Sequence, residues 1–203
     1  MRRLYGSSVS RACRSLIALE ELGLEYEHVP SLPGIRPGDR ELVDGLNPNG
    51  RVPILDDAGL VLWESMAINL YLGDRYGGPL WPGAPAERAA LYQWTLWGQT
   101  EMDRADFVEA RRSGDAERIA AARAAKAKAL GVLDRALAER PWLLGDAFTL
   151  ADVNVAATLS QPNENGKVDW DQLDPFALGL TRLGDWLRRC TSRDSWKKVG
   201  ALG

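Results

Sequence analysis

The 203-residue sequence has few of the residues that build metal centres and disulfide frameworks, with one histidine, His28, and two cysteines, Cys13 and Cys190. Two cysteines so far apart match neither a disulfide framework nor a zinc-binding spacing, and a single histidine excludes a multi-histidine metal site. A Ser-His-Asp triad would have only His28 as its base, and this residue follows a Tyr-Glu alternation typical of a strand end. We therefore expect no bound metal and assign His28 a surface role.

The sequence also lacks a strong excess of charge and any long hydrophobic run. Its 25 basic and 28 acidic side chains give a formal charge of −3, so the overall field favours neither nucleic acid nor an anionic membrane. No segment approaches the ~20 apolar residues that span a bilayer, and the N-terminal residues do not lead into the apolar core of a signal peptide. We expect a cytoplasmic protein that binds neither nucleic acid nor membrane.

What is present is an ordinary globular composition, with 45% hydrophobic and 26% charged residues. Chain-breaking residues concentrate in Gly77-Gly78-Pro79 and in residues 81–85, which neither a helix nor a strand accommodates. Short apolar runs alternate with helical patterns before this point, and long Ala-, Leu-, Arg- and Glu-rich helical stretches follow it. The sequence therefore predicts two domains, residues 1–78 and residues 86–203.

The first domain is predicted to be an α/β sandwich with a mixed sheet in the order βαβ(α)ββα. The expected strands span residues 3–6, 24–29, 51–55 and 60–63, and the expected helices span residues 10–22, 39–46 and 65–76. The second domain is predicted to be all-helical. Residues 86–112 and 116–140 are expected to form two long helices packed as an antiparallel pair, followed by helices from Thr149 to about 160 and over 175–190. A threonine at 149 followed by Asp152 is the pattern of a capping box.

Three features of the first domain bear on ligand binding, and the first is Ser10 at the junction of a strand and a helix. A hydroxyl at a helix N-terminus can donate to an anion that is held against free backbone N–H groups. Ser10 could equally be a helix N-cap and nothing more.

The second feature is a proline, Pro53, inside a predicted strand, where it cannot donate to the sheet. A cis peptide at Val52-Pro53 would leave the N–H and C=O of Val52 free to pair with an extended, peptide-like ligand. The alternative is a proline on an edge strand. The third feature is Glu64-Ser65 at a helix start, which could hold the ammonium and carboxylate of an amino acid, or could serve only as a cap.

The arrangement of these motifs resembles the glutathione S-transferase family over nearly the whole chain. The motifs are Leu4-Tyr5-Gly6-x-x-x-Ser10, Asn47-Pro48-Asn49-Gly50-Arg51-Val52-Pro53, Glu64-Ser65 and Phe148-Thr149-Leu150-Ala151-Asp152. The resemblance implies a thioredoxin-like N-terminal domain that binds glutathione and an all-helical C-terminal domain that lines a second-substrate pocket. It implies a transferase that activates the glutathione thiolate for attack on a small aromatic or anionic electrophile, with a role in detoxification. It also implies a homodimer.

The resemblance assigns a role to each site residue. Ser10 would stabilise the thiolate, Val52 would pair with the cysteinyl backbone, and Pro53 would be the cis-proline. Glu64 and Ser65 would hold the γ-glutamyl end. For the glycyl carboxylate the candidate cations are Arg51, Arg40 and Arg36, and Ser8 or Ser7 could replace Ser10 as the working hydroxyl. Cys13 lies one turn beyond Ser10 on an apolar stripe, where it could act in redox chemistry or simply pack in the core.

The second-substrate pocket is expected between the loop at residues 7–9 and the first long helix. One face of that helix would carry Trp97, Glu101, Arg104 and Phe107, which could hold an electrophile or could instead pack in the core or a dimer interface. Two other activities share the same site, a glutathione-dependent isomerase and a disulfide reductase. A non-catalytic binding or scaffold protein is a third alternative, because fold does not determine function.

Overall fold

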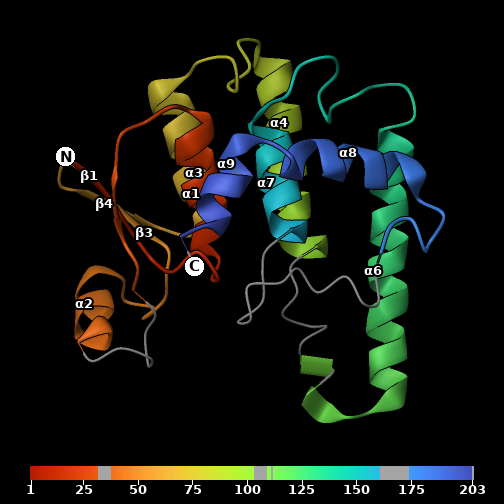
Figure 1. The fold of residues 1–203 in the computed structure, drawn as a ribbon, viewed down its shortest axis with the longest axis horizontal. Coiled ribbons are helices and arrows are strands. Elements are labelled where there is room, and N and C mark those ends of the chain that lie inside the picture. The colour runs from red at the N-terminus through yellow and green to blue at the C-terminus, as the bar shows by residue number, and fades with distance from the viewer. Residues whose placement is uncertain (32–37, 103–108, 111, 161–173, 203) are drawn as a thin grey trace.

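A computed structural model of the chain describes residues 1–31, 38–102, 109–110, 112–160 and 174–202. Its N-terminal part is a four-stranded mixed sheet in the order β2-β1-β3-β4 (Figure 1). Strand β1 runs parallel to β2 and antiparallel to β3, and β3 pairs antiparallel with β4. The elements are β1 Arg2–Tyr5, α1 Ala12–Glu21, β2 Glu27–Val29, α2 Asp39–Leu46, β3 Ile54–Asp57, β4 Leu60–Trp63 and α3 Ser65–Tyr76. This confirms the predicted thioredoxin-like order.

The two faces of the sheet are covered by different helices because side chains alternate along a strand. Leu4 and Leu55 point to one face and join a large buried cluster with residues of α1 and α3. Tyr5 and Ile54 point to the other face and pack with Val43 of α2. In Figure 1, α1 and α3 accordingly lie on the side of the helical domain and α2 lies apart from it.

The C-terminal part is helical and centres on α7. Its elements are α4 Pro85–Glu101, α6 Ala116–Ala136, α7 Leu150–Leu159, α8 Thr181–Thr191 and α9 Asp194–Gly200. Helix α7 is buried along nearly its whole length and packs against α4 and α1. The hydrophobic core is therefore continuous, through α7, between the N-terminal sheet domain and the C-terminal helices. None of the helices within the described ranges is long and apolar enough to cross a membrane.

Three expectations about these helices are wrong. Helix α4 ends at Glu101 instead of continuing to residue 112. In the described ranges α4 packs on α7 and α6 packs on α8, so the two long helices do not form an antiparallel pair. The buried helix α7 occupies the partner surface of α4 because it is buried on all sides, and Nδ2 of Asn154 on α7 donates to the hydroxyl of Thr95 on α4 at 2.9 Å. The last predicted helix begins at Thr181, not 175, and the short helix α9 follows it.

The predicted start of α7 is correct. Asp152 accepts hydrogen bonds from the backbone N–H groups of Thr149 and Leu143, each at 2.9 Å, and from Nε1 of Trp186 at 2.9 Å. The carboxylate thus closes the capping box and ties the helix start to α8 and to the preceding loop.

Helix α9 returns to the N-terminal part and is held against α1 by ionic contacts. The carboxylate of Glu21 is 7% exposed and accepts from Nε and Nη2 of Arg193 at 2.6 and 2.7 Å. The hydroxyl of Ser195 donates to the same carboxylate. A bidentate pair in such a shielded position fixes both the distance and the orientation of the two helices.

A second polar cluster lies at the other end of the sheet, where β1 begins and β3 ends. Asp57 accepts from the hydroxyls of Tyr71 at 2.9 Å and Tyr76 at 2.5 Å, and its other oxygen lies 3.4 Å from Nε of Arg2. Burial acts to raise the pKa of Asp57, but the tyrosine hydroxyls and the guanidinium outweigh it and the net pKa is lowered.

Candidate active site

The register of the sheet brings the three motifs that the sequence analysis considered for ligand binding to one edge. Tyr5 at the end of β1 pairs with Ile54 at the start of β3, and Ile54 pairs with Trp63 at the end of β4. The chain leaves the sheet after Tyr5 and Trp63 and enters it before Ile54. The segments at residues 6–10, 52–53 and 64–65 therefore emerge side by side from the same edge.

Close packing at Gly6 joins the first two segments. Gly6 has a φ of +136°, and a Cβ built there would lie 2.6 Å from Cβ of Ala12 and 3.1 Å from Cβ of Val52. Only glycine fits between the start of α1 and the segment at residue 52. The loop that carries Ser10 consequently lies against Val52.

The segment before β3 is a loop, whereas the sequence predicted a strand from residue 51. Asn47 organises this loop: its Nδ2 donates to the carbonyl of Arg51 at 2.7 Å, and its Oδ1 accepts from the N–H of Asn49 at 2.9 Å. The predicted cis peptide at Val52-Pro53 is present. Neither the N–H nor the C=O of Val52 bonds to any residue in the described ranges, so both are available to a ligand. This loop-organising role of Asn47 was not predicted from the sequence, although Asn before Pro is a turn signal.

The third segment begins α3 in an unusual conformation. The N-cap of α3 is Glu64, not Ser65 as the helix pattern suggested, and Glu64 has a φ of 72°. A non-glycine residue at positive φ costs energy and is found mostly where surrounding structure or function requires it. The Glu64 carboxylate is exposed, and among the described residues it has no hydrogen-bonding or ionic partner. Ser65 is buried as the first residue of α3, and its carbonyl accepts from the hydroxyl of Ser15 at 3.4 Å.

Ser10 lies at the start of α1, which begins two residues later than predicted. Its hydroxyl donates to the carbonyl of Ser7 at 2.7 Å and accepts from the N–H of Ala12 at 3.1 Å. The N-cap of α1 is Arg11, which makes no side-chain cap bond, so Ser10 is not the N-cap; it lies one residue earlier, and its hydroxyl accepts from the first N–H of the helix. Of the two alternative serines, Ser7 accepts from the N–H of Val9 at 3.4 Å through its hydroxyl, and Ser8 is 4% exposed.

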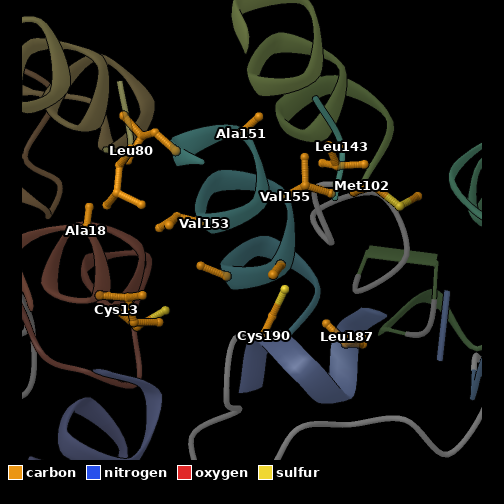
Figure 2. Packing of buried hydrophobic residues seen from close by; sticks show 14 of the residues in the cluster. Cys13, Ala18, Leu80, Met102, Leu143, Ala151, Val153, Val155, Leu187 and Cys190 are labelled. Atoms are coloured by element: carbon orange, nitrogen blue, oxygen red, sulfur yellow. The ribbon is translucent and has the colours of Figure 1, made fainter. Parts of the chain in front are cut away.

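Cys13 belongs to the hydrophobic core rather than to the site. It is 2% exposed, and Figure 2 shows it on α1 among the buried side chains that α1 and α7 share. Burial raises the pKa of its thiol to about 12. The thiol is thus protonated and shielded at neutral pH, which is the opposite of a reactive cysteine.

The three arginines proposed for the glycyl carboxylate differ in their surroundings. The Arg51 side chain is exposed, and its guanidinium has no hydrogen bond or ion pair with the described residues. Nη1 of Arg40 lies 3.6 Å from Oδ1 of Asp44, one turn along α2. Arg36 lies outside the residues that the structure describes.

Helix α4 borders the start of α1. Nη1 of Arg14, one turn beyond Ser10, donates to Oε1 of Gln99 at 3.1 Å. Trp97 is partly buried and packs edge-on against Trp94, with ring centroids 5.3 Å apart. This contact favours the packing alternative for Trp97.

Glu101, at the end of α4, is exposed, while Arg104 and Phe107 lie outside the described residues. As for metals, the described residues hold no group of three or more His, Cys, Asp or Glu side chains that could bind one.

Two family models match the chain. Residues 3–74 match the glutathione S-transferase N-terminal domain, and residues 89–194 match the glutathione S-transferase C-terminal domain. The chain belongs to the glutathione S-transferase family. Membership confirms the predicted enzyme class, a glutathione-dependent transferase with glutathione as cosubstrate.

Relatives align over almost the full length of this transferase. It is 33% identical to glutathione S-transferase GstB of Escherichia coli strain K12, over 98% of this chain and 97% of that protein. It is 31% identical to glutathione S-transferase D7 of Anopheles gambiae, over 98% of this chain and 92% of that protein. A solved structure, the theta class enzyme of Xanthomonas axonopodis pv. citri with glutathione bound, is 29% identical, with a TM-score of 0.79, and covers 100% of this chain and 98% of that one.

Proposed function

We propose that this transferase holds glutathione along the sheet edge where residues 6–10, 52–53 and 64–65 meet, and that Ser10 stabilises the thiolate. The pairing of Tyr5 with Ile54 and of Ile54 with Trp63 carries the proposal, because this register places all three segments together. Residues 1–78 form the glutathione-binding domain, and residues 86–203 form the domain that borders the second substrate.

Each part of glutathione meets a group of matching chemistry at this edge. The N–H and C=O of Val52 pair with the cysteinyl backbone, next to Pro53, as an added strand would. Glu64 accepts from the γ-glutamyl ammonium, while the hydroxyl and N–H of Ser65 at the N-terminus of α3 donate to the carboxylate. Arg51 binds the glycyl carboxylate, because Arg40 is already paired with Asp44.

The Ser10 hydroxyl activates the thiol as a donor and not as a base. When glutathione binds, the Ser10 hydroxyl stops donating to the carbonyl of Ser7 and donates to the glutathione sulfur instead. A thiol with a pKa near 8.5 is only about 3% thiolate at pH 7, and lowering the pKa by roughly two units gives about 75%. That shift costs about 2.7 kcal/mol, which a hydrogen bond to the charged sulfur (about 1.5–3 kcal/mol) and the α1 dipole (about 0.3–1 kcal/mol) can supply together.

The second substrate is a small aromatic or anionic electrophile bound between the loop at residues 7–9 and α4. The contact between Arg14 and Gln99 supports this position, since it brings α4 beside the first turn of α1. A disulfide reductase or an isomerase would use the same glutathione site. The protonated, buried thiol of Cys13 argues against a reductase that depends on a protein cysteine.

The protein is proposed to act as a cytoplasmic homodimer. Four large hydrophobic side chains are exposed: Leu60 and Trp63 on β4, and Tyr92 and Leu96 on α4. Exposed apolar and aromatic side chains of this kind mark protein interfaces. A monomer mass at micromolar concentration in light scattering would contradict this assembly.

Calorimetric titration with glutathione tests the binding mode. Glu64→Gln and Ser65→Ala each remove an anchor worth roughly 1.5–3 kcal/mol, so Kd should rise about 10- to 150-fold in each variant. Glu117→Gln is the control, because Glu117 is likewise an exposed carboxylate at the start of a helix but lies on α6. Unchanged affinity in both site variants would refute the proposed anchors.

A panel of electrophiles tests the reaction. It should include an aryl halide, an epoxide, an α,β-unsaturated carbonyl compound, an isomerisable unsaturated ketone and a small disulfide. We expect thioether formation with an aromatic or anionic member. Turnover of the disulfide alone would identify a reductase, turnover of the ketone without consumption of glutathione would identify an isomerase, and no turnover despite binding would identify a binding protein.

A further inference from the structure

His28, the chain's one histidine, makes a contact that its expected surface role did not include. It lies in the middle of β2, pairs with Leu4 of β1 and is partly buried. Its Nε2 lies 2.8 Å from the carbonyl oxygen of Gly6, at the point where the chain leaves the sheet toward Ser10. The imidazole therefore reaches from the neighbouring strand to the loop of the active site.

The peptide unit between Gly6 and Ser7 is held at both of its polar ends. Its carbonyl, on Gly6, receives the bond from His28, and its N–H, on Ser7, donates to the carbonyl of Ser31 at 2.9 Å. The N–H of Gly6 donates in turn to the carbonyl of Val29 at 2.9 Å. With both ends fixed, this peptide plane cannot rotate without breaking a hydrogen bond.

Ser7, the second residue of this peptide unit, connects it to Ser10 by hydrogen bonds. The carbonyl of the next residue, Ser7, accepts from the N–H of Ser10 at 3.0 Å and from its hydroxyl at 2.7 Å. We propose that His28 is a positioning residue, which holds the Gly6–Ser7 peptide and thereby the direction in which the Ser10 hydroxyl is presented. This inference rests on the proposed function, in which that hydroxyl stabilises the glutathione thiolate.

The chemistry of the bond determines which nitrogen of His28 carries a proton. A carbonyl oxygen only accepts, so Nε2 must be the donor and the neutral ring must be the Nε2–H tautomer. The imidazole also lines a surface groove of about 500 Å³ shared with Glu20, Glu25 and Lys198, which leaves room for a substituted side chain.

Titration of the bound glutathione thiol in substituted proteins tests the positioning role. His28→Phe keeps a ring of similar size but removes the donor, and it should raise the thiol pKa by about 0.5–1 unit, which lowers the thiolate fraction roughly three- to tenfold at a pH below that pKa. The glutathione Kd should change less than about threefold, because the anchors at residues 52, 64 and 65 do not involve this bond. His28→Gln, whose amide can donate from a similar position, should restore the wild-type pKa.

Glu27→Gln is the matched control, because Glu27 lies next to His28 on β2 and the change breaks its 2.8 Å ion pair with Arg3 of β1 without touching the loop. It should lower stability slightly and leave the thiol pKa unchanged. An unchanged pKa in His28→Phe, or an equal shift in Glu27→Gln, would overturn the inference. If His28→Phe does not fold, His28→Asn takes its place, because the shorter amide does not reach Gly6.

Two comparisons separate this inference from the function on which it rests. If Ser10→Ala also leaves the thiol pKa unchanged, the proposed role of Ser10 has failed; if Ser10→Ala shifts it and His28→Phe does not, only the role of His28 has failed. The imidazole nitrogens give a second readout that needs no glutathione. Long-range nitrogen–proton NMR should show a single imidazole in the Nε2–H tautomer, and the Nδ1–H tautomer would refute the bond to Gly6.

Discussion

The replacement Ser10→Ala is the sharpest test of the proposed mechanism, because it has two separable consequences: a loss of stability and a change in the pKa of the bound glutathione thiol. The bond from the N–H of Ala12 and the bond to the carbonyl of Ser7 stabilise the start of α1. Their loss should cost about 1 kcal/mol of unfolding free energy, the size typical of a side-chain bond to a free N–H at a helix start. This cost arises whether or not Ser10 takes part in catalysis.

The second consequence appears only if the hydroxyl donates to the thiolate. Losing a hydrogen bond to a charged sulfur, worth roughly 1.5–3 kcal/mol, raises the pKa of the bound thiol by about 1–2 units. If that pKa starts near 6.5, the thiolate fraction at pH 7 falls from about 75% to between roughly 3% and 25%. The proposed anchors at Val52, Glu64 and Ser65 remain, so glutathione affinity at pH 7 should fall only about three- to fourfold, the amount that the weaker ionisation of the bound thiol itself accounts for.

The assay is the ultraviolet absorbance of the glutathione thiolate as a function of pH in the saturated complex. Ser113→Ala is the matched control: the Ser113 hydroxyl donates to the carbonyl of Ala110 and accepts from the N–H of Asp115, the same spacing that Ser10 uses, but near the start of α6. It should lose similar stability with no shift in thiol pKa. An unchanged thiol pKa in Ser10→Ala refutes the mechanism, and a large shift in Ser8→Ala instead would assign the role to Ser8.

Three further predictions concern binding and stability. Arg51→Gln should raise the glutathione Kd about three- to tenfold, an effect that added salt diminishes, whereas Arg40→Gln should have little effect in the same titrations. Because the folded pKa of Asp57 is lowered, the stability that it contributes is present above its unfolded pKa of about 3.9 and is lost as the pH falls through the folded value. Urea unfolding at pH 7 and pH 3 should therefore differ less in Asp57→Asn than in the wild type, and an equal difference would contradict this assignment. Glu21→Gln should lower the unfolding free energy by about 2–3 kcal/mol in denaturant titrations, because it weakens the shielded pair with Arg193, and a loss below about 0.5 kcal/mol would show that this pair does not hold α9.

Local signals in the sequence were sufficient for the helices and motifs that depend on neighbouring residues. The capping pattern of Thr149 and Asp152 located the start of α7, and the span of α3 from Ser65 to Tyr76 followed from periodicity and the glycine after it. Pro53 indicated the cis peptide because a proline inside an apparent strand conflicts with sheet pairing. The motifs around Ser10 and Glu64 indicated the family, which the family models confirm.

Features that depend on contacts between distant segments were decided by the tertiary structure. Within the described residues α4 packs on α7 and not along α6, because the fully buried α7 requires packing partners on every side, and periodicity does not indicate which helices these are. The positive φ of Glu64 arises where β4 must turn into α3, and no residue preference predicts it. His28 reads as a surface residue in a strand pattern, and only the pairing of β2 with β1 brings its ring to the carbonyl of Gly6. Sequence determines the elements through short-range capping and periodicity, whereas the proposed glutathione-binding edge exists only because the strand register joins segments that lie far apart along the chain.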